Sequence, residues 1–224
     1  MNPSRFDVSP KEAVMLQKEL CEQVRLVPLE REPVLIGGCD VSMNRFAKEG
    51  FAGFVTLTSP ELVVIDHFAV ESTIPIPYVP GLLSFREIPM LMLAWEKLKT
   101  KPDVLMVDGI GIAHPRRLGI ASHLGLMLGI PTIGIAKSVL TGFHEEPGLE
   151  AGSTSPLIDL KTNETIGMAV RTKRGVKPVF VSPGHLITLD ESVELALSCV
   201  RKHRLPEPTR QAHLTVNEYR VRKG

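Results

Sequence analysis

The chain has 224 residues and a formal net charge of +1, and its 43% hydrophobic and 23% charged residues are ordinary for a globular protein, which we expect to form one domain over residues 1–224. Its three cysteines, Cys21, Cys39 and Cys199, are too few and too scattered for a disulfide framework or a zinc site, which favours a reducing, cytoplasmic location. The first residues show no apolar segment typical of a signal peptide, and the longest apolar run, 88–95, falls far short of the roughly 20 residues that span a bilayer.

The N-terminal third predicts one helix and three strands. Ser9 is placed to cap a helix over 9–26, with Pro10 at its first position, where a proline removes no helical hydrogen bond. Three strands with short polar connections follow, and they predict an antiparallel meander at 34–43, 51–59 and 62–72.

The middle of the chain alternates helices with continuous apolar strands. Helices are predicted over 84–99, where apolar residues recur on one face, and over 117–129, where Gly129 marks the C-terminal stop. The strands at 103–109 and 131–137 are apolar almost throughout, which is typical of parallel strands that are covered on both faces.

The last third predicts a glycine- and glutamate-rich loop over 144–155, a strand pair at 164–172 and 177–185, and a helix over 191–203. Taken together, the elements predict an α/β fold. Its mixed sheet has three antiparallel strands followed by parallel strands, and helices flank it.

Positive charge is concentrated in two places that the net charge conceals. Residues 201–224 contain seven Lys or Arg against two Glu, a local charge of +5, and residues 171–177 form a second basic cluster. Such patches bind phosphates in many proteins, although a solvated surface explains them equally well.

Three carboxylates stand out against this framework. Asp40 interrupts an apolar strand, Asp108 ends another, and Glu87 lies early on the helix between them. A charge in such a place is costly unless it is paired or binds a metal. If the first and fourth strands are neighbours, the two aspartates meet, and Glu87 completes a set of oxygen donors suited to Mg²⁺ or Mn²⁺. A metal held there activates water and stabilises the leaving oxygen of a phosphodiester.

Each carboxylate also has a purely structural explanation. Ser84 and Glu87 have the spacing of a capping box, so a helix cap also explains Glu87. Asp108 precedes Gly109, as turn aspartates often precede glycine, whereas Asp40 is harder to explain in this way.

The segment that follows Asp108 carries further candidates. Gly109 and Gly111 allow the backbone to approach a ligand closely, but the third glycine of a dinucleotide-binding fingerprint is missing. His114 is a candidate to bind a phosphate or transfer a proton, or else it is an ordinary loop residue. Lys137 ends an apolar strand, where it either reaches out to solvent or points at a phosphate.

Several longer stretches resemble one known family. In order from about residue 36 to 213, they are "GGCDVSM", "PYVPGLLSFRE", "KPDVLMVDGIGIAHPRRLGIASHLG", "IPTIGIAKSVL", "VSPGH" and "RLPEPTRQAH". Together they resemble endonuclease V, the deoxyinosine 3′ endonuclease family. The resemblance implies a ribonuclease H-like fold and Mg²⁺- or Mn²⁺-dependent hydrolysis of the second phosphodiester bond on the 3′ side of deoxyinosine in DNA.

The same resemblance assigns catalytic roles. It implies that the metal is held by Asp40, Glu87 and Asp108. It also implies that His114 and Lys137 handle the scissile phosphate, and that His213 lies near the active site and contacts the substrate.

The resemblance further implies a wedge that enters the nucleic acid at the lesion, with Tyr78 at its tip, formed by Pro77, Tyr78, Val79 and Pro80. A base that is flipped out of the stack needs a pocket, which we expect at Gly81, Leu83 and Gly109. Hypoxanthine presents an acceptor at O6 and a donor at N1, the reverse of adenine, so backbone N–H and C=O groups can distinguish the two bases.

Two residues depart from the pattern expected of the family. Ile110 replaces a polar residue between the two glycines, and Met43 replaces an aromatic residue, which leaves pocket shape and substrate preference open. The family also includes members that act on inosine in RNA, so RNA is a second candidate substrate. Another ribonuclease H-like nuclease, a non-catalytic nucleic-acid binder and a small-molecule α/β enzyme are the remaining alternatives, and a monomer is the expected state.

Overall fold

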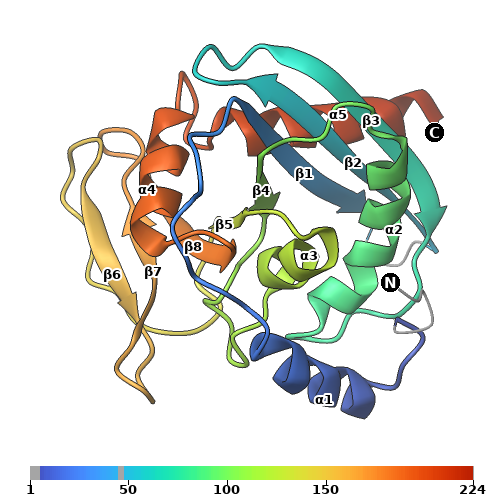
Figure 1. Ribbon diagram of the computed structural model, residues 1–224, viewed down its shortest axis with the longest axis horizontal. Coiled ribbons are helices and arrows are strands. Elements are labelled where there is room, and N and C mark those ends of the chain that lie inside the picture. Colours follow the sequence, from blue (N-terminus) through green and yellow to red (C-terminus); the bar gives the residue numbers. More distant parts are fainter. Residues whose placement is uncertain (1–5, 45–47, 224) are drawn as a thin grey trace.

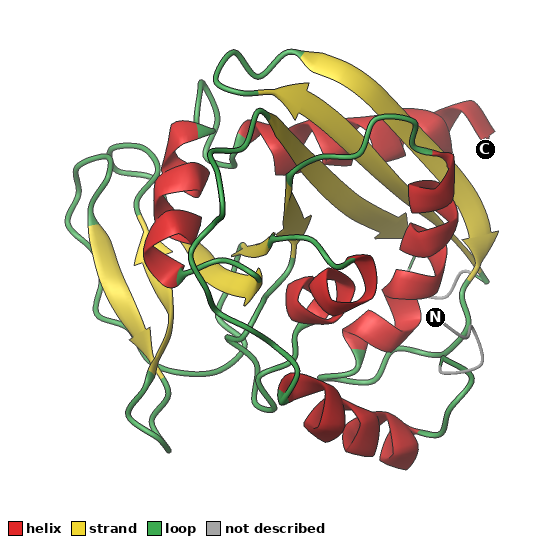
Figure 2. Cartoon of the chain, viewed as in Figure 1, coloured by secondary structure: helices red, strands yellow, loops and turns green. Residues whose placement is uncertain are grey.

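Eight strands form one mixed sheet in the computed structural model, which describes residues 6–44 and 48–223 (Figure 1, Figure 2). The strands lie in the order β3-β2-β1-β4-β5-β8-β7-β6. Their bounds are β1 (Leu35–Met43), β2 (Glu49–Thr58), β3 (Val64–Thr73), β4 (Val104–Asp108), β5 (Thr132–Ala136), β6 (Thr154–Ile158), β7 (Thr165–Val170) and β8 (Val179–His185). The helices are α1 (Pro10–Cys21), α2 (Leu83–Lys97), α3 (Ile120–Leu128), α4 (Leu189–Ser198) and α5 (Glu207–Lys223). Among these described helices, none has the length and apolar character to cross a bilayer.

The pairing of the strands follows the predicted pattern. β1, β2 and β3 form the antiparallel meander, and β4 pairs with the other edge of β1 in parallel. β5 lies parallel to β4, whereas β8 pairs with β5 antiparallel. The predicted mixed α/β sheet is therefore confirmed, and its first and fourth strands are neighbours.

Helices cover both faces of the sheet (Figure 1). On one face α1, α2 and α3 enclose a core with β1, β2 and β4 that includes Phe54, Phe85 and Leu105. On the other face α4 packs against β8 and α5 packs against β1 and β2, and Met106 belongs to the core on this side. Leu105 and Met106 face opposite sides because successive residues of a strand alternate. Because helices cover both faces of the sheet, a polar site is expected at the ends of the strands.

Local sequence signals set the ends of two helices as predicted. Ser9 caps α1 by accepting a hydrogen bond from the backbone N–H of Glu12, whose carboxylate binds back to Ser9. Gly129 follows the last residue of α3 in the left-handed conformation, with a φ of +66°. α3 begins later than predicted, at Ile120, because Arg117 adopts a positive φ in the turn before it.

Two elements were not predicted. β6 begins inside the segment 144–155, which the sequence predicts as a loop, and pairs antiparallel with β7. α5 is preceded by Pro206 and has Pro208 in its first turn, where proline is tolerated. Two prolines so close together are not typical of a helix, so the sequence does not indicate one here.

α5 lies unusually close to β1. A Cβ atom on Gly38 would come within 1.9 Å of the carbonyl oxygen of Pro208, so only glycine at this position allows the contact. This approach brings the side chains of α5 within hydrogen-bonding reach of the second half of β1.

Candidate active site

Asp40 and Asp108 lie beside each other on neighbouring strands. Cys39 of β1 is the register partner of Val107 of β4, so the next residue of each strand, Asp40 or Asp108, lies on the same face of the sheet. Asp40 is buried, and burial followed by the charge of Asp108 raises the pKa of Asp40. The structure therefore brings the two aspartates together, as the sequence predicted.

The capping-box interpretation of Glu87 is wrong. α2 begins at Leu83, so Ser84 lies inside the first turn and makes no side-chain cap. The Ser84 hydroxyl instead forms a hydrogen bond with Nδ1 of His123 at 3.0 Å. Glu87 is thus free of any capping role and faces the aspartates.

The electrostatics of Glu87 indicate that the three carboxylates share one region. Burial, and then the charges of Asp40 and Asp108, raise the pKa of Glu87 to about 8. Buried carboxylates that repel one another in this way are a donor set that a divalent cation neutralises. Because all the donors are carboxylate oxygens, the set fits Mg²⁺ or Mn²⁺ better than a softer metal.

Protein groups already engage two of these carboxylates. Nζ of Lys137, which directly follows β5, lies 2.5 Å from Oδ2 of Asp108, and Nδ1 of His213 in α5 lies 2.8 Å from Oδ2 of Asp40. Across residues 6–44 and 48–223, no three His, Cys, Asp or Glu side chains are arranged as a closed metal-binding group. Binding of an ion by this set therefore requires the carboxylates to move toward it.

A cavity of about 160 Å³ is lined by residues that are near two of the carboxylates in the sequence. Gly109, in its wall, follows Asp108 directly, and Leu83 precedes Glu87 by one helical turn. This volume is below the roughly 300–1,000 Å³ of pockets for drug-sized ligands, which suits a single flat ring system. All three predicted pocket residues line the cavity, together with Gln17, Tyr78, Ser84, Ile110, His114, Leu118, Gly119, Ile120 and Leu140.

His114 lies in the wall of the cavity. Its side chain is buried, Nδ1 accepts a hydrogen bond from the backbone N–H of Arg116, and Nε2 therefore donates to the carbonyl oxygen of Gly81 at 3.1 Å. Burial, and then the charge of Arg116, lower the pKa of His114 to about 4. With both nitrogens bonded to backbone groups, His114 supports the wall of the cavity, and its contact with a phosphate stays a prediction.

Gln17, which lines this cavity, was missed by sequence analysis, and Arg116 holds it in place. Arg116 donates through Nη2 to the carbonyl oxygen of Gly81 at 2.8 Å and through Nε to Oε1 of Gln17 at 2.5 Å. Gln17 is only 1% exposed and lies between Ala13 and Leu20 on the buried face of α1. A single polar residue on an apolar helix face is the signal that could have identified it.

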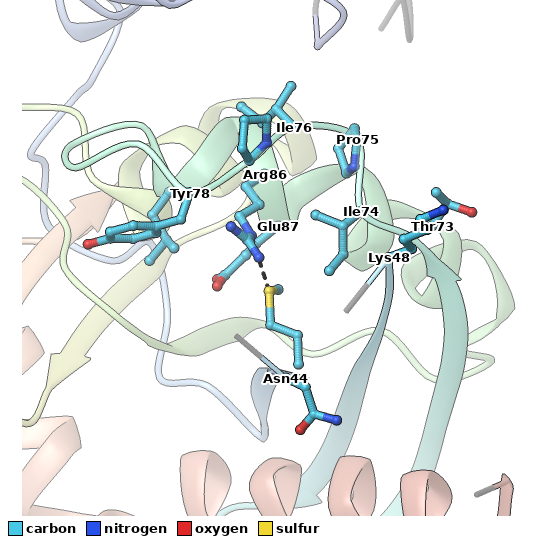
Figure 3. A pocket seen from close by; sticks show the side chains of 12 residues that line it. Asn44, Lys48, Thr73, Ile74, Pro75, Ile76, Tyr78, Arg86 and Glu87 are labelled. Carbon is cyan, nitrogen blue, oxygen red and sulfur yellow. Dashed lines mark hydrogen bonds between the residues drawn. The ribbon is translucent and has the colours of Figure 1, made fainter. Parts of the chain in front are cut away.

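Tyr78 stands at the edge of a wider groove (Figure 3). Its side chain is 64% exposed and Pro77 and Pro80 are exposed beside it, whereas Val79 packs against the core. The groove has a volume of about 810 Å³, and its other lining residues include Met43, Lys48, Ile74, Arg86 and Glu87. Because Tyr78 lines both the groove and the smaller cavity, an exposed aromatic ring lies where the two meet.

A family model described as Endonuclease V matches residues 18–214. The chain belongs to the Endonuclease V family. Endonuclease V of Myxococcus xanthus is 49% identical over 226 residues, covering 99% of this chain and 94% of the relative. The crystal structure of Endonuclease V from Streptomyces avermitilis has a TM-score of 0.90 at 38% identity, covering 96% of this chain and 95% of that one.

A second Endonuclease V structure bears on substrate. The protein from Ciona intestinalis was solved in complex with a 23mer DNA that contains an inosine followed by a ribo-adenosine. It has a TM-score of 0.86 at 27% identity and covers 97% of this chain and 100% of that one. The predicted family is thereby confirmed, and with it membership of a family of nucleases that act on DNA.

Proposed function

We propose that this protein is a metal-dependent DNA repair endonuclease that binds deoxyinosine, the product of adenine deamination, and hydrolyses the second phosphodiester bond on its 3′ side. The proposal is carried by one observation, the placement of Asp40, Glu87 and Asp108 next to a cavity of the size of one base. Hydrolysis of a phosphodiester needs the carboxylates, and selection of one damaged base needs the cavity.

Recognition begins with extrusion of the base. Flipping costs a few kcal/mol and is least costly for a mispaired base such as hypoxanthine. The exposed ring of Tyr78 is placed to stack in the vacated space, which offsets part of that cost. In the cavity, Leu83 is the first residue of α2, so its backbone N–H has no partner within the helix and is suited to donate to O6 of hypoxanthine.

Hydrolysis takes place at the carboxylates. Asp40, Glu87 and Asp108 would hold Mg²⁺ or Mn²⁺, which supplies an activated water and stabilises the leaving oxygen. Glu87 would hold such an ion in its deprotonated form, as metal ligands do. Lys137 lies beside Asp108 and places a positive charge where it can neutralise the scissile phosphate.

The direct test is cleavage of an end-labelled DNA strand that carries one deoxyinosine, with Mg²⁺ present, against the same strand carrying adenine. We expect one product, cut at the second bond on the 3′ side of the lesion. Asp40→Ala and Asp108→Ala should abolish cleavage and still bind the lesion, whereas Asp190→Ala, which changes an exposed aspartate in α4, should cleave normally. An intact lesion strand, or equal cutting of both strands, contradicts the proposal.

RNA is the second arm of the same assay. The Ciona intestinalis complex contains a ribo-adenosine after the inosine. The assay therefore compares three inosine-containing strands: DNA, RNA, and DNA with this one ribonucleotide. We expect cleavage of the DNA strand. A preference for the two strands with a 2′-hydroxyl would instead assign the protein to inosine in RNA.

A further inference from the structure

Polar side chains on one face of α5 form hydrogen bonds with polar side chains on one face of β1. In the strand, Asp40 and Ser42 are two positions apart and therefore point to the same side of the sheet. In the helix, His213, Asn217 and Arg220 are spaced by four and three positions, so they form one row along its surface. The row of α5 lies over the strand, and each of its three side chains takes part in hydrogen bonds that lead to Asp40.

These hydrogen bonds form a continuous chain. Nη1 of Arg220 donates to Oγ of Ser42 at 3.0 Å, and the Ser42 hydroxyl donates to Oδ1 of Asn217 at 3.1 Å. Nδ2 of Asn217 lies 3.0 Å from Nε2 of His213, and Nδ1 of His213 lies 2.8 Å from Oδ2 of Asp40. The chain thus runs from a permanent cation to a buried carboxylate.

In this row of hydrogen bonds, each group's role as donor or acceptor is determined by the group before it. Arg220 has only donors, so Ser42 accepts from it and directs its single hydrogen to Oδ1 of Asn217. That bond fixes the amide of Asn217 with its nitrogen toward Nε2 of His213, which must accept. The ring proton of His213 is therefore on Nδ1, from which it is donated to Asp40.

We propose that Asn217, held by Ser42 and Arg220, is a positioning residue of this site: it keeps His213 in the Nδ1–H tautomer and so fixes the orientation of Asp40 for a divalent cation. The proposal rests on the proposed function, because it takes Asp40 as a metal ligand. Groups that orient a ligand from behind typically change metal affinity by 10- to 100-fold when they are removed. Asn217 would act only through His213 and Asp40, and so without touching the substrate.

The test uses two pairs of variants of the whole chain. Asn217→Ala removes the amide, and Glu218→Ala is its control, since Glu218 is the next residue on α5 and is exposed. Ser42→Ala removes the hydroxyl that fixes the amide, and Ser42→Thr keeps a hydroxyl at the same position of the strand, where a β-branched residue is well tolerated.

Two measurements do not depend on cleavage. Nitrogen-15 NMR of the histidine rings in the metal-free protein reports which ring nitrogen of His213 carries the proton. Electron paramagnetic resonance of Mn²⁺ then gives its dissociation constant. We expect a mixture of tautomers and roughly tenfold weaker Mn²⁺ binding in Asn217→Ala and Ser42→Ala, with native values in Glu218→Ala and Ser42→Thr.

The outcomes separate this inference from the proposed function. Retention of the Nδ1–H tautomer together with native Mn²⁺ affinity in both alanine variants overturns the inference, even if the protein cleaves deoxyinosine strands. Loss of the single tautomer and of native Mn²⁺ affinity in the alanine variants supports the inference, even if deoxyinosine strands are not cleaved. If Asn217→Ala does not fold, the comparison of Ser42→Ala with Ser42→Thr decides alone, since rescue by the threonine requires the hydroxyl and not merely the packing.

Discussion

The side-chain amide of Gln17 in α1 donates to the carbonyl oxygen of Gly81 at 3.0 Å, although the two residues are 64 positions apart in the chain. Arg116 and His114 donate to the same oxygen, at 2.8 and 3.1 Å. Gly81 has a φ of +78°, a conformation that glycine adopts at no steric cost, and it lies between Tyr78 and the start of α2. Three donors on one carbonyl hold this turn in a single conformation, so the first helix supports the turn that joins the predicted wedge to the cavity.

Gln17→Ala is therefore expected to weaken recognition of the lesion. The change removes the hydrogen bonds to Gly81 and Leu118, and it leaves Nε of Arg116 without its acceptor, Oε1 of Gln17. Each buried hydrogen bond that is left unmade costs about 1–3 kcal/mol. We expect a lower melting temperature and roughly tenfold weaker binding of a deoxyinosine strand, measured by fluorescence anisotropy without metal. Gln23→Ala is the matched control because Gln23 is exposed. If both variants bind like the native protein, Gln17 does not support the turn.

The stability of the metal-free protein should fall as the pH rises from about 6.5 to 8. Because the pKa of Glu87 is raised from an ordinary 4.5 to about 8, its stabilising contribution is complete below pH 4.5 and is lost as the pH rises through 8. His114 and His123 have pKa values lowered by burial to about 4, so they add stability as the pH rises from about 4 to 6.5. Above pH 6.5 the two histidines no longer change the stability, and the pH dependence that is left is the loss of the Glu87 contribution.

Urea titrations of Glu87→Gln, with a chelator present, test this dependence. The native free energy of unfolding should decrease by up to about 1.4 kcal/mol per pH unit in this window, because one proton is released on unfolding. Glu87→Gln should show a nearly flat profile, whereas Glu96→Gln, which changes an exposed glutamate of the same helix, should follow the native curve. Parallel curves for the native protein and Glu87→Gln would mean that Glu87 is ionised throughout.

Lys137→Met should separate metal binding from cleavage. The ammonium group lies 2.5 Å from Oδ2 of Asp108, where it competes with a metal ion for that oxygen and repels it. Its removal is expected to strengthen Mn²⁺ binding several-fold. At saturating Mn²⁺, cleavage should nevertheless fall by roughly 100-fold, as is usual when a group that stabilises developing charge is lost.

The matched control is Lys177→Met, because Lys177 is an exposed lysine in a loop. It should change neither the affinity for Mn²⁺ nor the rate at saturating metal. Native cleavage by Lys137→Met at saturating Mn²⁺ would exclude Lys137 from the chemical step and leave it only as a counter-charge for Asp108.

The meeting of Asp40 and Asp108 was predictable because it needs only the strand order. Two apolar strands that each carry an aspartate near their carboxyl ends become parallel neighbours in this fold, and the register then follows from pairing. The role of Glu87 was less secure, because the spacing of Ser84 and Glu87 does not reveal that α2 begins before Ser84. A shift of the helix start by two residues, from Phe85 to Leu83, turns a cap into a buried serine that binds His123.

The hydrogen bonds behind His213 were beyond the reach of sequence analysis. α5 exposes a mostly polar surface, and Ala212 and Val216 are its few buried apolar residues beyond the first turn, so no helical period is visible in the sequence. The spacing of Asn217 and Arg220 acquires a meaning only once α5 is known to lie over β1. Tertiary packing, not local pattern, therefore creates this part of the site.

Tyr78→Ala tests the wedge with little effect on folding, because the side chain is 64% exposed. Stacking of one base on an aromatic ring contributes about 1–3 kcal/mol, so binding of a deoxyinosine strand should weaken by roughly 5- to 150-fold. Tyr78→Phe keeps the ring and should bind as the native protein does. Affinity for Mn²⁺ should be native in both variants, since Tyr78 is not a candidate metal ligand.

The comparison of duplex with single strand sharpens this test. A base flipped from a duplex leaves a space that the ring fills, whereas a single strand leaves no such space opposite a partner base. Anisotropy titrations of Tyr78→Ala should therefore show a larger loss of affinity for a duplex that contains deoxyinosine than for the corresponding single strand. An equal loss for undamaged duplex would assign Tyr78 to general DNA binding, and the ring would then have no part in finding the lesion.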